Sequence, residues 1–179
     1  MMQNLATLVW VSGFLFATDP PPGVWLDIPF VMQKKDGCGA ASVAMVMEYW
    51  QAQQGGSVPA NAAQIERDLP PDGSHGIYAS DMQRYFEKKG YATFAFRGEW
   101  SDLEEHLQKG RPLIVALKPG SMGSLHYVVV AGFDQERQLV LVNDPAQRKL
   151  LKEDRSRFEQ GWKGAGRWTL LALPGTGAH

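Results

Sequence analysis

The 179-residue sequence contains only one cysteine, Cys38, and this scarcity excludes several kinds of protein. A single thiol cannot form a disulfide within the chain, and no CxxC pair is present to bind a structural zinc ion. The four histidines show no metal-type spacing with one another (His75, His106, His126 and His179). A P-loop sequence, GxxxxGK followed by Ser or Thr, is also missing. We therefore expect neither a metal nor another cofactor, and nothing supports ATP binding by this chain.

A surplus of charge of one sign is absent as well. The chain has 18 Lys and Arg against 19 Asp and Glu, a formal net charge of -1. Nucleic-acid-binding domains carry a basic surface, so we expect no nucleic acid as a partner. Hydrophobic residues make up 44% of the chain and charged residues 21%, as in globular domains. A chain of this length without repeats or long linkers predicts one domain, over residues 23–175, and we expect it to be a monomer.

The apolar run at the N-terminus, Leu5–Ala17, is too short for a comfortable membrane span. Its length is that of the apolar part of a signal peptide, and Pro20–Pro22 then suits a linker. No Lys or Arg precedes the run, and Leu15-Phe16-Ala17 is a poor cleavage site. Residues 1–22 are therefore a candidate signal or membrane-anchoring segment with a Pro-rich linker, or else contain a buried strand. An exported, a membrane-associated and a cytoplasmic protein all remain open.

The spacing of apolar residues predicts helices in the first half of the chain and strands in the second. Residues 38–53 are apolar on nearly every face, which is typical of a buried helix. Further helices are expected over 61–69, over 81–89 with Ser80 as its N-cap, and from Ser101 to residue 109 with Ser101 and Glu104 as a capping pair. Strands are expected over 112–117, 126–133, 138–142 and 167–173, with a short strand or extended segment over 25–31. The pattern predicts an α+β fold, in which a helical lobe with a central helix packs on an antiparallel sheet.

Cys38 begins the helix expected over 38–53, directly after Asp36 and Gly37. At this place free backbone N–H groups and the positive end of the helix dipole can lower a thiol pKa from about 8.5 to roughly 3.5–7.5, which makes the thiolate a nucleophile near pH 7. Gln33, a few residues earlier, can donate its side-chain amide to a developing oxyanion. A buried structural cysteine is the alternative interpretation, because a lone cysteine usually has that role.

His126 opens the most apolar strand, and Asp144 follows the next strand along the chain. With a hairpin turn near residues 135 and 136, position 144 falls opposite about position 127, beside His126. An ordinary histidine at the edge of the core and an Asp-Pro turn are the alternatives. Together, Cys38, His126 and Asp144 fit a thiol nucleophile, a proton-transferring imidazole and a carboxylate that orients it. Gln33 and the Cys38 backbone N–H would then supply the oxyanion donors.

The segment Gln33–Met47, with Asp-Gly-Cys-Gly-Ala-Ala at its centre, resembles the bacteriocin-processing cysteine peptidases. These papain-fold enzymes cleave leader peptides after a double glycine, often as a domain of an ABC exporter. Shorter segments extend the likeness over most of the chain from residue 25 to 173, namely 76–90, 111–115, 126–129, 143–145 and 158–162. The resemblance implies that Cys38 is the nucleophile, His126 the general base and acid, Asp144 the orienting carboxylate and Gln33 the oxyanion glutamine.

The resemblance also implies a cysteine peptidase that acts on a peptide or protein substrate through a thioester acyl-enzyme. No transmembrane helices or ATPase follow the matching region, so we expect a free-standing member of the family. Two alternatives use the same fold: an inactive peptide-binding module, and an acyltransferase or amidase with the same triad. The reactivity of Cys38 separates the inactive module from the enzymes, and cleavage of peptides separates the peptidase from the other enzymes.

Overall fold

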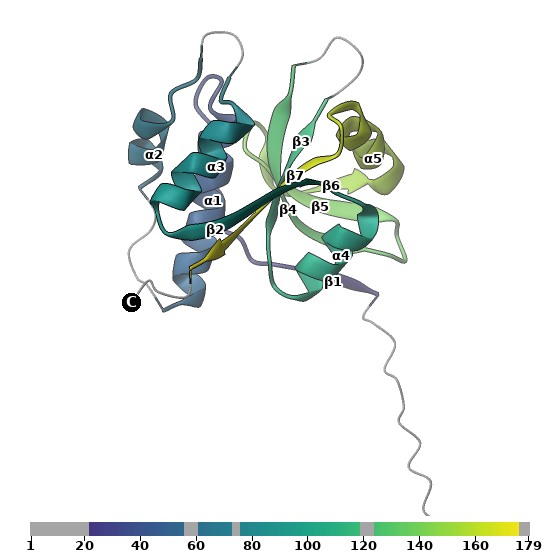
Figure 1. The fold of residues 1–179 in the computed structure, drawn as a ribbon. Coiled ribbons are helices and arrows are strands. Elements are labelled where there is room, and N and C mark those ends of the chain that lie inside the picture. The colour runs from purple at the N-terminus through teal and green to yellow at the C-terminus, as the bar shows by residue number, and fades with distance from the viewer. Residues whose placement is uncertain (1–21, 56–60, 73–75, 119–123, 176–179) are drawn as a thin grey trace, which may run out of the picture.

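A computed structural model describes residues 22–55, 61–72, 76–118 and 124–175 of the chain (Figure 1). The apolar run Leu5–Ala17, with its candidate signal or anchor, lies outside these residues. Within the described ranges, no helix combines the length and the apolarity needed to cross a membrane.

The architecture is one antiparallel sheet with helices on both faces (Figure 1). In chain order the elements are β1 (Gly23–Trp25), α1 (Cys38–Gln53), α2 (Ala62–Asp68), α3 (Ala79–Lys88), β2 (Tyr91–Arg97), α4 (Trp100–Gln108), β3 (Leu113–Leu117), β4 (His126–Asp134), β5 (Leu139–Asp144), β6 (Arg148–Asp154), α5 (Arg155–Gly164) and β7 (Trp168–Pro174). Seven strands of the described residues form the sheet in the order β2-β7-β3-β4-β5-β6, with β1 paired to β4. Each of these pairs is antiparallel, and the predicted α+β fold is confirmed.

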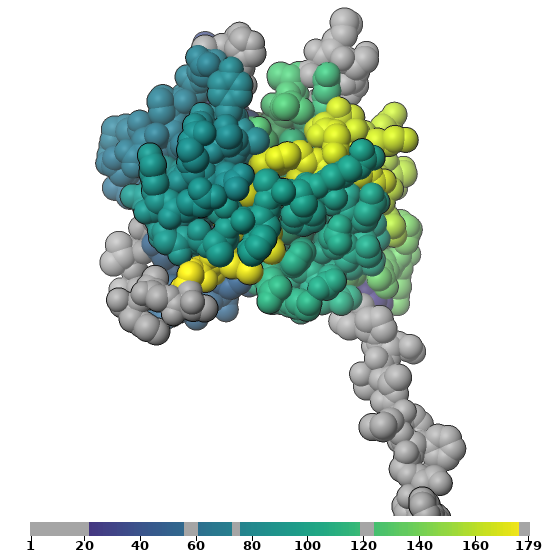
Figure 2. Space-filling model, in the orientation of Figure 1, coloured from purple at the N-terminus to yellow at the C-terminus, as the bar shows by residue number. Residues whose placement is uncertain are grey.

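Alternating side chains of the central strands divide the core into two layers. On one face, Ile114, Val129 and Leu170 pack with α1, α2 and α3. On the other face, Leu113 and Val128 pack with α4 and α5. A strand that is apolar at successive positions is therefore buried on both sides, because neighbouring residues point to opposite faces. In the space-filling view, the blue-teal surface of α2 and α3 lies on the left, and the right side carries the teal-green surface of α4 with the green and yellow surface of the strands and α5 (Figure 2).

The central helix α1 has the bounds that the sequence predicts, and it is buried without interruption from Cys38 to Met47. Close neighbours reach its first turn because residue 39 is a glycine. A Cβ on Gly39 would lie 3.0 Å from Met82 Sδ of α3 and 3.1 Å from Ile77 Cβ. One turn further along, the buried Ser42 hydroxyl donates a hydrogen bond of 3.4 Å to the backbone carbonyl of Tyr127 in β4. The close approach at Gly39 packs the start of α1 on Ile77 and α3, and the Ser42 hydrogen bond fixes it against the start of β4.

Two strands, β2 and β6, were not expected from the sequence. Both lie at the edges of the sheet, and their sequences, YATFAFR and RKLLKED, contain exposed and charged positions. An edge strand needs a partner on one side only and tolerates polar residues, so its hydrophobic pattern is weak. Of the segment expected as a strand or extended over 25–31, only Trp25 belongs to β1. The following residues have no regular structure, although the Leu26 N–H still donates to the Ala131 carbonyl at 2.7 Å.

Both predicted serine caps are wrong. Helix α3 begins at Ala79 with Tyr78 as its N-cap, so Ser80 lies inside the helix. Helix α4 begins at Trp100, one residue before Ser101. Its cap is reciprocal: the Glu99 carboxylate accepts from the backbone N–H of Asp102, and the Asp102 carboxylate accepts from the backbone N–H of Glu99 at 2.7 Å. A carboxylate accepts these hydrogen bonds as well as a hydroxyl does. The sequence pattern therefore assigned the N-cap to the nearby serine instead of to Glu99.

Gly132→Ala is expected to lower the midpoint of urea unfolding. Gly132 in β4 pairs with Trp25 of β1, and a Cβ at this position would lie 2.3 Å from the carbonyl oxygen of Val24. Overpacking of this kind costs about 1–3 kcal/mol, because β1 has to move away from β4. The first part of the segment that leads to Gln33 would lose its anchor as well.

Gly161→Ala in α5 is the matched control for this experiment. A Cβ on Gly161 would meet Leu117 Cβ at 3.8 Å, which is an ordinary van der Waals contact. Alanine in a helix is favoured over glycine by about 0.5–1 kcal/mol, so this variant is expected to be at least as stable as the parent. Equal unfolding midpoints for the two variants would contradict the close packing of β1 on β4.

Candidate active site

Cys38 is the first residue of α1, and the turn before it leaves the helix N-terminus without a side-chain cap. The Gly37 N–H donates to the Lys34 carbonyl at 3.0 Å, and Asp36 closes this turn with a φ of 59°. Gly37 is the N-cap, and the first turn of α1 contains no acidic residue. The first backbone N–H groups of the helix are therefore free to face an anion at the Cys38 thiol.

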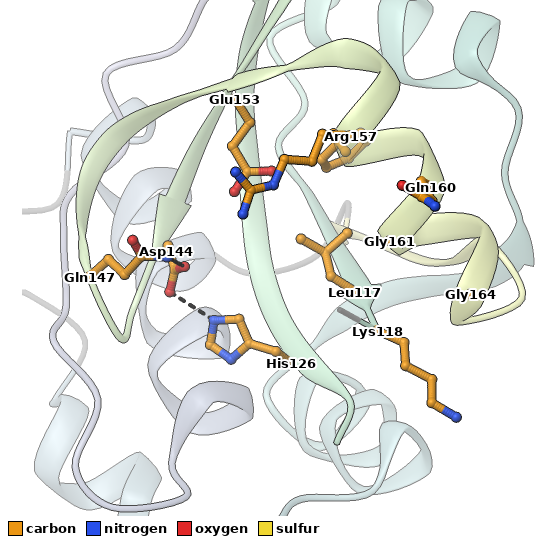
Figure 3. Close-up of a pocket in the computed structure, with 11 residues that line it drawn as sticks. Leu117, Lys118, His126, Asp144, Gln147, Glu153, Arg157, Gln160, Gly161 and Gly164 are labelled. Carbon is orange, nitrogen blue, oxygen red and sulfur yellow. Dashed lines mark hydrogen bonds and ion pairs between the residues drawn. The ribbon is translucent and has the colours of Figure 1, made fainter. Parts of the chain in front are cut away.

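His126 and Asp144 come together across the hairpin of β4 and β5. The Nε2 atom of His126 lies 2.7 Å from Oδ1 of Asp144, and Figure 3 shows the two side chains pointing at each other. Asn143 pairs with Val129, so the register runs one residue away from the expected partner at 127. The reason is that the turn lies one residue later than expected, since Asp134 pairs with Leu139, and the irregularity between Val130 and Gly132 offsets half of the resulting shift. The proximity of the two residues survives this shift.

The Asp144 carboxylate is held by more than the imidazole. Its Oδ1 accepts from the Ala146 N–H at 2.8 Å, and its Oδ2 accepts from the side-chain amide of Gln147. Burial alone would raise the pKa of Asp144, but the hydrogen bond and charge of His126, together with these two donors, lower it below its ordinary value. The side chain is only 5% exposed, against 24% for His126, so the carboxylate charge acts mainly on the imidazole rather than on solvent. Gln147 was not singled out from the sequence.

The thiol and the imidazole shift each other's protonation. Burial raises the pKa of Cys38, but a hydrogen bond with His126, backbone N–H groups of Tyr127 and Gly39, and the imidazolium charge outweigh it and lower the pKa. Burial likewise lowers the pKa of His126, yet hydrogen bonds with Asp144 and Cys38 and their charges raise it to about 9. Because Nε2 is bonded to Asp144, Nδ1 is the ring nitrogen left for the thiol. Both shifts favour the charged forms, so the geometry favours a thiolate–imidazolium pair over the neutral pair.

Gln33 is positioned by the loop that carries Asp144. Its backbone N–H donates to the Pro145 carbonyl at 2.9 Å, which joins the segment before α1 to the loop after β5. The side-chain Oε1 is buried and accepts no hydrogen bond from the described residues. The amide oxygen of Gln33 is thus not committed to a structural hydrogen bond.

Asn143, which was not singled out from the sequence, holds the segment before α1 in place through its side-chain amide. It is completely buried, its Nδ2 donates to the Ile28 carbonyl at 3.2 Å, and its Oδ1 accepts from the Leu150 N–H at 2.9 Å. One amide therefore ties the segment that leads to Gln33 to both β5 and β6. Asn143 stands directly before Asp144 and Pro145 in the sequence. Nothing in a single sequence indicates, however, that the side chain of an asparagine is buried and hydrogen-bonded.

A cavity of about 660 Å³ opens beside His126 on the α5 side of the sheet. His126, Asp144 and Gln147 form one wall, and residues of β3, β6 and α5 form the rest (Figure 3). Neither Cys38 nor Gln33 lines it among the described residues. In the same part of the chain, no cluster of His, Cys, Asp and Glu side chains has the arrangement of a metal site.

Comparisons with known proteins identify the family and the fold. The model of a family described as "Peptidase_C39 like family" matches residues 25–169. A crystal structure described as a C39-like peptidase from Bacillus anthracis has a TM-score of 0.68 and 18% identity, over 84% of this chain and 97% of that one. A double glycine motif protease from an AMS/PCAT transporter, in complex with the leader peptide, has a TM-score of 0.63 and 23% identity, over 84% of this chain and 94% of that one.

A third similar structure is the peptidase domain of another ABC transporter. The peptidase domain of Streptococcus ComA, a bi-functional ABC transporter, has a TM-score of 0.63 and 21% identity, over 81% of this chain and 97% of that one. At these identities the structures establish a shared fold, that of papain-like C39 cysteine peptidases. No curated protein sequence matches the chain.

Asp144→Asn is expected to lower the pKa of His126 from about 9 toward the ordinary value of roughly 6.5, because the imidazolium loses both its charged acceptor and its negative neighbour. An NMR titration of the histidine ring protons, assigned with His126→Ala, measures the change. The half-buried His106 is the internal control, since its pKa is lowered by burial and by Arg111 and does not depend on Asp144. A His126 that titrates near 6.5 in the parent protein would show that the ion pair does not form.

Proposed function

The chain belongs to the Peptidase_C39-like family, whose model matches residues 25–169, and on this basis we propose that it hydrolyses peptide bonds as a cysteine peptidase. The observation that carries the proposal is the 2.7 Å hydrogen bond between His126 and Asp144, beside a cysteine whose pKa is lowered. The peptidase domain of this proposal spans residues 23–175. Its substrate is a peptide or a protein segment that enters the site in an extended form.

In the first half of the proposed reaction, the Cys38 thiolate attacks the carbonyl carbon of the scissile peptide bond. The carbonyl oxygen becomes an oxyanion, which the Cys38 backbone N–H and the side-chain amide of Gln33 stabilise by hydrogen bonds. The tetrahedral intermediate then collapses, and the imidazolium of His126 gives its proton to the leaving nitrogen. A free amine departs, and the acyl group stays on Cys38 as a thioester.

In the second half, a water molecule attacks the thioester carbonyl while neutral His126 takes one of its protons. Collapse of this second tetrahedral intermediate releases the carboxylic acid and restores the thiolate–imidazolium pair. Asp144 remains ionised throughout, holds the imidazole in one orientation and stabilises its charged form. Its burial strengthens this effect, because solvent screens the charge less.

The two pKa shifts set the pH range in which this chemistry runs. Below the lowered pKa of Cys38 the thiol is protonated and no longer a nucleophile. Above the His126 pKa of about 9 the imidazole is neutral and cannot protonate the leaving nitrogen. Between these limits the ion pair is the dominant form, and both requirements are met.

Cys38→Ala is expected to abolish cleavage of a peptide library, read by mass spectrometry as new peptide ends, while the urea unfolding curve stays close to that of the parent. The thiolate is the nucleophile that attacks the peptide bond in the proposed mechanism, and alanine fits the space of a buried cysteine. Cleavage retained by the variant would remove Cys38 from the mechanism. A parent protein that cleaves no peptide, although its thiol is reactive, would contradict the peptidase proposal and favour an amidase or acyltransferase.

A further inference from the structure

The cavity beside His126 is placed asymmetrically with respect to the proposed triad. His126 and Asp144 belong to its wall, whereas Cys38 and Gln33 do not line it among the described residues. Figure 3 shows the cavity extending from the imidazole toward Glu153, Arg157 and helix α5. The cavity therefore begins at the imidazole and not at the thiol.

The proposed mechanism determines which part of a substrate meets this side. The carbonyl carbon bonds to Cys38, and its oxygen points at the donors of Cys38 and Gln33. The leaving nitrogen receives its proton from His126, so this nitrogen and the residues that follow it lie next to the imidazole. A cavity that begins at the imidazole is thus open to the residue on the C-terminal side of the scissile bond.

The walls of the cavity suit a large side chain rather than a small one. Leu117 provides apolar surface, and Gly161 of α5 leaves the space of a side chain empty, because a Cβ there would have its nearest neighbour at 3.8 Å. Glu153 and Arg157 supply one charge of each sign on the wall across from His126 (Figure 3). A volume of about 660 Å³ lies within the range of roughly 300–1,000 Å³ that is usual for ligand pockets.

We propose that this cavity is a specificity pocket for the first residue after the scissile bond, and that it selects a large side chain with an apolar body over glycine. The proposal rests on the proposed peptidase function. It adds a preference on the C-terminal side of the cleaved bond, set by the β3 end and helix α5 rather than by the helical lobe.

Gly161 offers a direct way to fill the pocket. A Cβ on this residue would point toward Leu117, with its nearest atom, Leu117 Cβ, at 3.8 Å, so a side chain enters the cavity without a backbone clash. Gly161→Leu is the filling variant. Lys163→Leu is its matched control, because Lys163 lies exposed on the same helix and does not line the cavity. Leu117→Ala is the opposite change, since it enlarges the cavity.

The substrates are peptides derived from one that the parent protein cleaves in the library experiment, identical except for glycine, alanine, leucine, phenylalanine or tryptophan after the scissile bond. For the parent we expect kcat/KM to be at least about tenfold higher with leucine than with glycine, which is the usual discrimination of an apolar pocket. Gly161→Leu should bring this ratio to about one, and Lys163→Leu should leave it unchanged. Leu117→Ala should move the preference toward phenylalanine and tryptophan.

The outcomes separate this inference from the function on which it rests. A parent protein that cleaves peptides with the same kcat/KM for glycine and leucine overturns the pocket and leaves the peptidase function intact. An equal loss for all five peptides in Gly161→Leu, with an unfolding curve like that of the parent, overturns the pocket as well. Failure of the parent to cleave any library peptide overturns the peptidase function first.

Discussion

The hydrogen bond between His126 and Asp144 is the interaction on which the rest of the site depends. It holds a nearly buried carboxylate against an imidazole, and this charge keeps the pKa of His126 at about 9 in spite of burial, which acts in the opposite direction. The imidazolium in turn lowers the pKa of Cys38. If the carboxylate were moved or neutralised, desolvation would favour a neutral imidazole and a protonated thiol. The fold around the site serves to keep these three groups at fixed positions.

Three separate contacts perform this task. The Ser42 hydroxyl holds α1 against the backbone of β4, Asn143 ties the segment before α1 to β5 and β6, and the Gln33 N–H bonds to the loop after Asp144. Each contact is a hydrogen bond between two chain segments, and each of the two segments contains a different residue of the site. The Cys38 thiol therefore comes from the helical lobe and the imidazole and carboxylate from the sheet, yet neither part is free to shift alone. The cavity adjoins this framework at His126 and Asp144, and the β3 end and α5 form its other walls.

The elements that carry the site could be predicted from the sequence because their signals are local. The all-round apolar pattern of α1, the apolar run of β4 and the short hairpin to β5 each show within a few residues, and together they bring His126 and Asp144 into proximity. The edge strands β2 and β6 lack such a pattern, since each has a neighbouring strand on one edge only and tolerates exposed polar residues. Gln147 and Asn143 act through bonds to residues that only the folded chain brings near. The cavity could not be predicted at all, because its walls come from separated segments and Gly161 contributes to it only through the absence of a side chain.

The central claim is that Cys38 and His126 form an ion pair near neutral pH, and the most direct test is the pH dependence of Cys38 alkylation by iodoacetamide. In the parent protein the reaction is expected to proceed well below pH 7. In His126→Ala the onset should move toward that of a free thiol, near pH 8.5, because the imidazolium no longer stabilises the thiolate. The same profile for both proteins, with alkylation only near pH 8.5 or only after unfolding, would contradict the account and favour a peptide-binding module without activity.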